Sequence, residues 1–313
     1  MALLGGGGTA AADAQKPPAV TSVTKDGRTW HLKVYSAAMD KDIAVDVQRP
    51  VDESIPAPNL YLLNGLDGGE GTANWKTQTD VLGWMADKQV NVVQPIGGQG
   101  SYYTDWLKPD PVLGVNEWKT FFTEELPPLL DSTLNSTGLN GLAGTSTSGT
   151  SVLQLAEAKP GLFKSVAAYS GCAQIADPAG QLFVNLAVGT WAGGDTKNMY
   201  GPSDSPLWAA NDPVINAEKL RGTQLYVSAG SGIPVANDVQ YYLNNGGPTT
   251  LALGMIIEGA VNACSHNLKG KLDSLNIPAT YQFNPVGTHY WPYWQQALEE
   301  SWPLLAQGMG LAN

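Results

Sequence analysis

The sequence predicts an α/β fold in which a mostly parallel central sheet is flanked by helices. The first observation is a series of short apolar runs, which lie at residues 60–63, 90–95, 139–143, 166–170, 225–229 and 279–283. Runs of this kind are typical of strands that are buried on both faces. The second observation is that helical patterns lie between them, notably at 118–130 and 293–302. Strands that alternate with helices form a doubly wound sheet, which binds ligands at the carboxyl ends of its strands.

Two parts of the chain depart from this alternation. Residues 17–50 alternate apolar and polar side chains, as in 29–35 and 43–47, which predicts antiparallel strands. Residues 178–222 are rich in Gly, Pro, Trp and Asn, and we expect a lid-like insertion there. The alternative is an irregular surface excursion with a small core of its own.

The rest of the domain organisation is simple. We expect residues 17–313 to form a single catalytic domain, since no linker divides them. Residues 1–16 are rich in Gly and Ala and lack a basic start, so they are expected to be a flexible tail or the remnant of a secretory signal.

Composition and charge exclude several functions. The formal net charge of −11 argues against binding to nucleic acid or to an anionic membrane surface. The sequence contains no run of about 18 apolar residues, so a transmembrane helix is not expected. Cysteine and histidine are not clustered at metal-ligand spacing, and the lysine signature of a phosphate-binding loop is missing. The sequence therefore predicts neither a metal site nor a cofactor.

Residues 144–149, which read Gly-Thr-Ser-Thr-Ser-Gly, contain the candidate nucleophile Ser146. They follow the apolar run 139–143 and precede the helix-like run 150–158. A serine at a tight turn from strand to helix, with glycine two residues before it, is the nucleophile elbow of the α/β-hydrolase fold. The turn exposes the serine hydroxyl above the sheet. The sequence thus predicts an α/β-hydrolase that uses Ser146 as its nucleophile.

A serine nucleophile needs a base, and the chain has three histidines. The α/β-hydrolase order is serine, acid, histidine, so His289, which follows the run 279–283, is the expected base. His266, in a helix-like stretch, and His31, which precedes the elbow, remain alternatives.

The acid is harder to choose. The candidates between Ser146 and His289 are Asp177, Asp195, Asp204, Asp212, Asp238, Glu258 and Asp273. Most of the aspartates lie beside Gly, Pro or Asn, where such residues form turns and caps. Glu258 is the exception, because it is the only carboxylate in an apolar run. A solvated helix face that lacks other charges is the alternative reading of that run.

An acyl-transfer site also needs an oxyanion hole, which is a pair of hydrogen-bond donors for the negatively charged oxygen of the intermediate. The backbone N–H of Thr147, next after the nucleophile, is one expected donor. The other is the N–H of Leu66, in the glycine-rich loop 64–69 that follows the run 60–63.

From about residue 30 to 306 the chain resembles the mycolyltransferases of the antigen 85 type. The motifs that carry the resemblance are LLNGL at 62–66, PIGGQGSYYTDW at 95–106, WKTFFTEELP at 118–127, GPS at 201–203 with Trp208 and NDP at 211–213, and GTHYWPYW at 287–294.

The resemblance implies an exported or cell-envelope acyltransferase of a mycolate-containing actinobacterium, which moves a mycolyl chain from trehalose monomycolate to an acceptor hydroxyl. By motif it assigns the nucleophile to Ser146, the base to His289 and the acid to Glu258. It assigns the oxyanion donors to Leu66 and Thr147 and a wall of the sugar pocket to Trp291.

Three positions depart from the family pattern. Asn64 and Asp67 stand where relatives often have an aspartate and an arginine that contact trehalose, so the resemblance implies that both bind the substrate. Tyr290 stands where close relatives have a serine. The acyl-enzyme chemistry is unaffected, but the acceptor is left open between trehalose, arabinogalactan and protein hydroxyls. A corynebacterial-type enzyme with shorter acyl chains is also compatible. A secreted serine esterase and a non-catalytic wall-binding protein of the same fold remain alternatives.

Cys172 and Cys264 are the two cysteines. Taken alone, they are compatible with one disulfide in an exported protein or with two buried thiols in the cytosol. With the resemblance in hand we predict a disulfide, because Cys172 follows the strand after the elbow helix and Cys264 lies shortly after Glu258.

Overall fold

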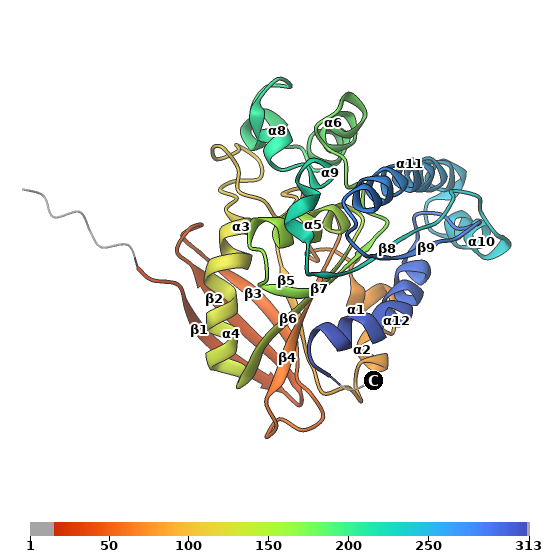
Figure 1. Cartoon of the computed structure of the whole chain (residues 1–313). Coiled ribbons are helices and arrows are strands. Elements are labelled where there is room, and N and C mark those ends of the chain that lie inside the picture. The colour runs from red at the N-terminus through yellow and green to blue at the C-terminus, as the bar shows by residue number, and fades with distance from the viewer. Residues whose placement is uncertain (1–15, 312–313) are drawn as a thin grey trace, which may run out of the picture.

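The computed structural model describes residues 16–311, and a nine-stranded sheet lies at its centre (Figure 1). The expected apolar runs all become strands. The strands are β1 Ala19–Asp26, β2 Thr29–Ser36, β3 Lys41–Gln48, β4 Ala57–Leu63, β5 Asn91–Ile96, β6 Ser136–Thr145, β7 Phe163–Tyr169, β8 Gln224–Ala229 and β9 Thr280–Phe283.

The sheet has the order β1-β2-β3-β5-β4-β6-β7-β8-β9. The pairs β1–β2, β2–β3 and β3–β5 are antiparallel, whereas every pair from β5 to β9 is parallel. The prediction of a mostly parallel sheet with early antiparallel strands is therefore confirmed. The parallel strands end at one edge, and the segments that follow β4, β6 and β9 meet there.

Helices cover both faces of the sheet because its central strands are apolar on both faces. In β4, Tyr61 and Leu63 belong to one core, and Leu60 and Leu62 belong to the other. The first core also contains side chains of α4, α5 and α11, and the second contains those of α1, α2 and α12. The longer helices are α4 Leu126–Leu134, α5 Thr147–Ala158, α10 Ala236–Asn244, α11 Gly247–Ser274 and α12 Trp291–Gly308, and the short ones include α1 Trp75–Gln78, α2 Val81–Trp84 and α3 Trp118–Thr120.

The helical pattern at 118–130 is not one regular α-helix. Between α3 and α4 lies a π-helical turn, η1 Phe121–Glu125. Pro127 and Pro128 lie in the first turn of α4, and proline has no N–H to continue the regular hydrogen-bond ladder. The N–H of Leu126 accordingly donates to the carbonyl of Phe121, five residues earlier.

The insertion at 178–222 lies over the carboxyl edge of the sheet, at the top of Figure 1. It packs around its own small core, which includes Val188, Met199 and Trp208 and is joined by Tyr102 and Trp106. The insertion therefore has the small core of its own that the alternative, an irregular surface excursion, predicted. Its first helices also line a pocket, as a lid would. Its elements are α6 Pro178–Asn185, η2 Leu186–Trp191, α7 Thr196–Met199, α8 Pro206–Ala210, α9 Pro213–Asn216 and η3 Ala217–Leu220.

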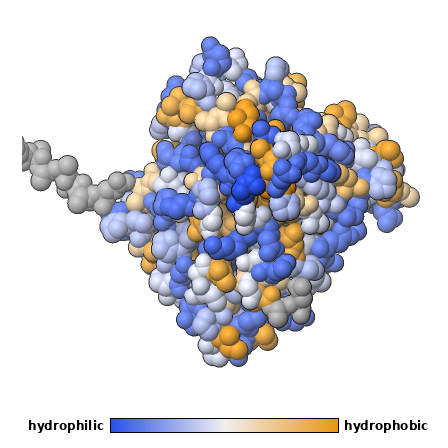
Figure 2. Space-filling view, viewed as in Figure 1, coloured by the Kyte–Doolittle hydropathy of each residue, from blue (hydrophilic) through white to orange (hydrophobic). Residues whose placement is uncertain are grey.

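The predicted tail at residues 1–16 falls, apart from Lys16, outside the described residues. Within residues 16–311, no helix has the length and apolar character that crossing a membrane requires. On the face seen in Figure 2, hydrophobic residues form small separate patches among hydrophilic ones. Scattered patches of this size are usual on a protein surface, so binding sites are better sought in the cavities.

Candidate active site

Ser146 occupies the turn between β6 and α5 with the unusual backbone angles φ 57° and ψ −124°. A non-glycine residue rarely adopts a positive φ, so the surrounding structure must hold it there. The Ser146 N–H donates to the carbonyl of Tyr169 (3.0 Å), and the Ser146 carbonyl accepts from Gly149 N–H (3.0 Å). Space is tight as well, since a Cβ at Gly144 would lie 2.6 Å from the carbonyl oxygen of Ser148. This is the geometry of a nucleophile elbow.

His289 lies in the loop between β9 and α12 and faces Ser146. Its Nε2 is 2.8 Å from Ser146 Oγ, and its Nδ1 is 2.8 Å from Glu258 Oε2. The backbone is also fixed, because the His289 N–H donates to the Gly254 carbonyl and Tyr242 Oη donates to the His289 carbonyl (2.6 Å). With Nδ1–H donating to a carboxylate, Nε2 is left to accept the serine proton.

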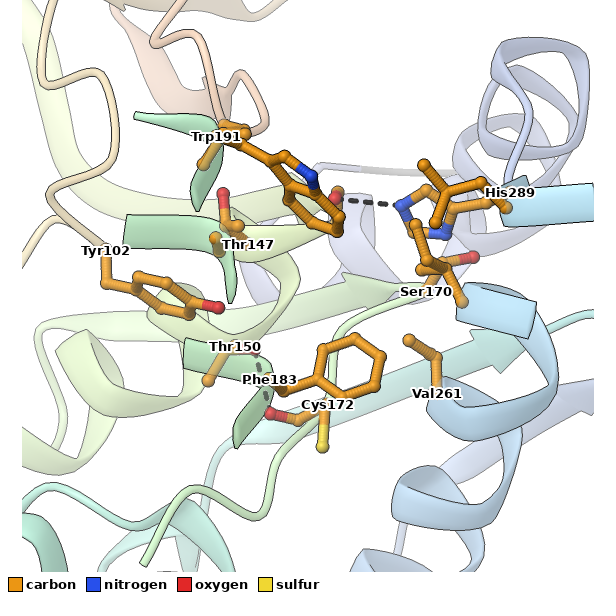
Figure 3. Close-up of a pocket in the computed structure, with 14 residues that line it drawn as sticks. Tyr102, Thr147, Thr150, Ser170, Cys172, Phe183, Trp191, Val261 and His289 are labelled. Carbon is orange, nitrogen blue, oxygen red and sulfur yellow. Dashed lines mark hydrogen bonds between the residues drawn. The ribbon is translucent and has the colours of Figure 1, made fainter. Parts of the chain in front are cut away.

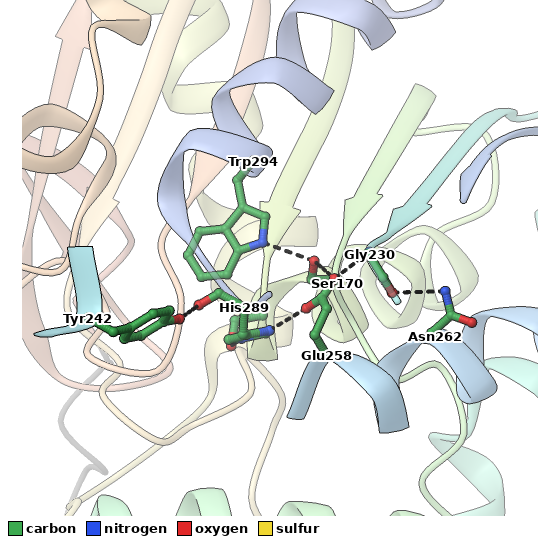
Figure 4. Close-up of polar contacts among 8 residues, drawn as sticks. Ser170, Gly230, Tyr242, Glu258, Asn262, His289 and Trp294 are labelled. Atoms are coloured by element: carbon green, nitrogen blue, oxygen red, sulfur yellow. Dashed lines mark hydrogen bonds and ion pairs between the residues drawn. The ribbon is translucent and has the colours of Figure 1, made fainter. Parts of the chain in front are cut away.

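Glu258 lies on α11 and is almost fully buried, with 1% of its side chain exposed. The alternative of a solvated helix face is therefore wrong. A buried carboxylate needs hydrogen-bond donors, and Glu258 has three. Oε2 faces His289, while Oε1 accepts from Gly230 N–H (2.6 Å) and Ser170 Oγ (2.8 Å), as Figure 4 shows.

Ser170 and Trp294 support this site, and no sequence pattern singles them out for that role. Trp294 Nε1 donates to Ser170 Oγ (2.9 Å), and Ser170 Oγ in turn donates to Glu258. The Trp294 ring also meets the His289 ring edge-to-face at 4.9 Å. Ser170 follows β7 and Trp294 lies on α12, but no spacing in the sequence indicates that the two side chains are in contact.

The rival bases lie elsewhere. His31 Nδ1 is 2.6 Å from Asp46 Oδ1, across the β2–β3 pair. His266 Nδ1 contacts the carbonyl of Asn262, and its ring stacks on Phe283. Neither histidine contacts Ser146.

The rival acids have structural contacts of their own. Asp177, Asp195 and Asp212 cap the first turns of α6, α7 and α9. Asp273 pairs with Lys269, and Asp204 is exposed. Asp238 caps α10 and accepts a hydrogen bond from Tyr293 Oη (3.0 Å).

The two expected oxyanion donors lie on either side of the serine. Leu66 and Thr147 both line the cavity that contains Ser146 Oγ and His289. Within residues 16–311, neither of their amide N–H groups has a hydrogen-bond partner. The Leu66 carbonyl accepts from Gly100 N–H (2.8 Å), which holds the loop in place. Gly65 lies against the nucleophile, since a Cβ there would be in van der Waals contact with the Cβ of Ser146, at 3.4 Å.

Ser146 lies where two cavities meet. The apolar pocket, of about 310 Å³, is lined by Phe183, Ala187 and Trp191 from α6 and η2 and by Leu253, Ile257 and Val261 from α11. The last three are spaced four residues apart, so they share one helix face. Figure 3 shows several of these side chains around the dashed contact to His289.

The second cavity has a volume of about 270 Å³ and is here called the polar pocket because Asp67 and Gln99 line it, although the rest of its wall is mostly apolar. It shares Ser146 and Leu66 with the apolar pocket, and its other walls include Asp67, Gln99 and Trp291. Trp291 and Asp67 thus line the same cavity as Ser146. Asp67 Oδ1 accepts from Gly69 N–H (3.0 Å), which leaves the second carboxylate oxygen for a ligand.

Asn64, the third residue expected to contact sugar, has a different place. It is buried and lines neither pocket. Its Oδ1 accepts from the backbone N–H of Trp75 (3.1 Å), so it anchors the start of α1. Tyr290 stacks on Tyr241, with ring centroids 4.2 Å apart.

Cys172 and Cys264 form a disulfide, as expected. It ties the segment after β7 to α11, six residues beyond Glu258, and Cys172 itself lines the apolar pocket. The bridge thus anchors the helix that presents both the buried acid and one wall of the cavity.

Reduction of this disulfide is expected to lower the free energy of unfolding by about 2–5 kcal/mol, because a bridge between residues 92 apart restricts the unfolded chain. Urea denaturation with and without reductant measures the change. The variant Cys172→Ala/Cys264→Ala is the control, and it should not respond to reductant. An unchanged midpoint in the wild-type protein would show that the bridge does not anchor α11.

The fold and the arrangement of Ser146, His289 and Glu258 define an enzyme of the α/β-hydrolase class. Comparison with known proteins agrees, since the family model described as "Putative esterase" matches residues 36–305. The chain is 32% identical to the diacylglycerol acyltransferase/mycolyltransferase Ag85A of Mycobacterium leprae, over 99% of this chain and 90% of that protein. The chain therefore belongs to the esterase family and, within it, to the Ag85-type acyltransferases.

Solved structures support the fold. The crystal structure of Mycobacterium tuberculosis MPT51 (FbpC1) superposes with a TM-score of 0.76 at 22% identity, covering 91% of this chain and all of that one. An S-formylglutathione hydrolase from Agrobacterium tumefaciens superposes with a TM-score of 0.65 at 16% identity, covering 93% and 100% of the two chains. At these identities the likeness concerns the fold alone.

Proposed function

We propose that this protein is a mycolyltransferase, with residues 17–313 as its catalytic domain. It would transfer a mycolyl group from trehalose monomycolate to an acceptor hydroxyl through a seryl acyl-enzyme. The observation that carries the proposal is the position of Ser146, whose side chain lies at the junction of two pockets, one lined by apolar faces of α6, η2 and α11 and the other lined by Asp67, Gln99 and Trp291. A glycolipid ester has the same division, because an acyl chain and a sugar meet at the bond to be cleaved.

In the first step Ser146 Oγ attacks the ester carbonyl carbon while its proton passes to His289 Nε2. Glu258 holds the imidazole in the required tautomer and stabilises the positive charge that forms on it. The N–H groups of Leu66 and Thr147 donate to the oxyanion. When the intermediate collapses, His289 gives the proton to the sugar oxygen, and trehalose leaves from the polar pocket. The acyl chain stays in the apolar pocket as an ester of Ser146.

In the second step an acceptor hydroxyl enters the polar pocket. His289 removes its proton, and the acceptor oxygen attacks the carbonyl of the acyl-enzyme. Collapse of this second intermediate returns the proton from His289 to Ser146 Oγ and releases the acylated acceptor. In each of the two steps one ester bond breaks and one ester bond forms. The acceptor candidates are trehalose, arabinogalactan and a protein hydroxyl, and the protein would work outside the cell or in the cell envelope.

A transferase must favour a sugar hydroxyl over water, and the pockets support this. The apolar walls formed by α6, η2 and α11 limit water around the acyl chain. Trp291 and Asp67 supply an apolar surface and a hydrogen-bond acceptor for a sugar. A plain serine esterase, as the formylglutathione hydrolase likeness would suggest, needs space for its leaving group but no site that holds an acceptor sugar.

The proposal predicts that an added sugar acceptor diverts the acyl group from hydrolysis to transfer. With trehalose monomycolate as donor, products are separated by chromatography in the presence and absence of trehalose or arabinan oligosaccharides. We expect acylated acceptor to exceed free mycolic acid by at least about tenfold at saturating acceptor, which corresponds to about 1.4 kcal/mol. Free acid as the main product at every acceptor concentration would instead identify an esterase. Failure of a fluorophosphonate to label Ser146 would favour a non-catalytic wall-binding protein.

A further inference from the structure

A third cavity lies beside the polar pocket, and the acyl-transfer steps above do not use it. Its volume is about 350 Å³, and it is here called the distal pocket. Its lining includes Lys41, Asp42, Glu70 and Gln99 and the buried Trp118. It is more polar than the apolar pocket, since charged and amide side chains form much of its wall.

The topology brings these residues together. Strand β3 runs antiparallel to β5, with Ala44 opposite Ile96. The amino end of β3, which carries Lys41 and Asp42, therefore lies beside the carboxyl end of β5. Glu70 comes from the loop after β4, and Gln99 comes from the loop after β5. The distal pocket thus opens at the same sheet edge as Ser146.

A tight contact between two loops separates the distal pocket from the polar pocket. The Gly97 N–H donates to the Gly68 carbonyl (2.9 Å), and a Cβ at Gly68 would lie 2.3 Å from the Gly97 carbonyl oxygen. Gly68 has a positive φ of 64°, which suits glycine at this close approach. Gln99 lies next to this contact and lines both pockets, so one extended ligand could occupy the two pockets at once.

The side chains here are available to a ligand. Gln99 is exposed, and among the described residues its side-chain amide has no hydrogen-bond partner. The Glu70 carboxylate likewise makes no hydrogen bond within residues 16–311. Lys41 Nζ lies over the Trp118 ring at 5.5 Å from its centroid and forms no ion pair in that part of the chain.

The charges indicate the ligand class. One cation and two carboxylates line the distal pocket, and a third carboxylate, Asp67, lines the polar pocket. Their negative balance disfavours an anion such as a phosphate or an acidic polymer. Side-chain donors and acceptors beside the apolar surfaces of Trp118 and Val112 suit a neutral polyhydroxylated chain, whose hydroxyl groups both donate and accept.

We propose that the distal pocket binds further sugar units of a neutral oligosaccharide acceptor whose reacting hydroxyl lies in the polar pocket. This inference rests on the proposed transferase function and deepens it, because it assigns the acceptor to the oligosaccharide class rather than to a free disaccharide or a protein side chain. The chemistry at Ser146 is unchanged, and the distal pocket contributes binding alone.

The test measures transfer against acceptor length. Neutral arabinan and glucan oligosaccharides of two to six units, trehalose and a serine-containing peptide serve as acceptors, with a fixed donor. We expect kcat/KM to rise at least about tenfold from the disaccharide to the hexasaccharide and the peptide to be the poorest acceptor.

A pair of matched variants localises the effect. Val112 lines the distal pocket and is 65% exposed, whereas Val115, on the same loop, is 38% exposed and does not line it. Val112→Trp should fill the pocket and abolish the dependence on length, while donor hydrolysis and transfer to trehalose stay within about twofold. Val115→Trp should keep the dependence. Glu70→Ala should raise KM for the hexasaccharide without lowering kcat, as loss of ground-state binding does.

The outcomes separate the two proposals. Equal kcat/KM for short and long acceptors, an unaltered length dependence in Val112→Trp, or preference for the peptide would overturn the distal-pocket proposal and leave the transferase function standing. If no acceptor is acylated while the donor is hydrolysed, the transferase function itself fails, and the distal-pocket proposal fails with it.

Discussion

Replacing Ser146 with alanine is expected to lower kcat for transfer by about 10⁴–10⁶-fold, the range found when a serine nucleophile is removed from a comparable site. The only lost group is Oγ, which lies 2.8 Å from His289 Nε2. Without it no acyl-enzyme forms, and the remaining groups can stabilise only a direct attack by water or acceptor. Steady-state assays with trehalose monomycolate, or with a chromogenic ester, measure the loss.

The Ser146 variant should remain folded, because the backbone bonds of Ser146 to Tyr169 and Gly149 do not involve its side chain. Circular dichroism and thermal melting check this directly. Ser132→Ala is a suitable control, since Ser132 is an exposed serine on α4 whose hydroxyl donates only to the carbonyl of Leu129. A Ser146→Ala protein that keeps nearly full turnover would mean that the nucleophile lies elsewhere.

Replacing Glu258 with glutamine is expected to lower kcat by about 10⁴-fold, as in a site where an amide replaces the orienting carboxylate. The change preserves shape but removes the negative charge. An amide oxygen can still accept from Gly230 and Ser170 in place of Oε1. The amide NH₂ would then face His289 Nδ1 in place of Oε2. Nδ1 must then be the acceptor, so the proton moves to Nε2, which can no longer accept from Ser146.

Asp238→Asn is the matched control for this variant. Asp238 is the next buried acid near the site, but it contacts Tyr293 Oη and the start of α10 rather than His289. We expect this variant to keep activity within about tenfold of the wild type. A mild effect at Glu258 combined with a severe one at Asp238 would reassign the acid.

Much of the fold could be predicted because its signals are local. The strand β4 is buried at every position because both of its faces are covered, and its apolar run 60–63 is visible in the sequence. The elbow is visible for a similar reason, because a tight turn at Ser146 requires small neighbours. The order of serine, acid and histidine then restricts the choice of base to a loop after the last strand.

The rest could not be predicted because it depends on contacts between distant residues. The burial of Glu258 follows from the packing of α11 against the sheet, and pattern alone left a solvated face possible. The support from Ser170 and Trp294 spans 124 residues. Asn64 was expected to contact sugar because of its motif position, yet its side chain turns inward to the Trp75 amide.

The central claim, that Ser146 carries the acyl group between donor and acceptor, is tested most directly by mass spectrometry of the protein after brief incubation with trehalose monomycolate. We expect an adduct of one mycolyl group without trehalose, mapped to the peptide that contains Ser146, and lost again when an acceptor sugar is added. The Ser146→Ala protein should show none. An acyl group on another residue, or turnover by the wild-type protein with no adduct even when the acceptor is withheld, would contradict the claim.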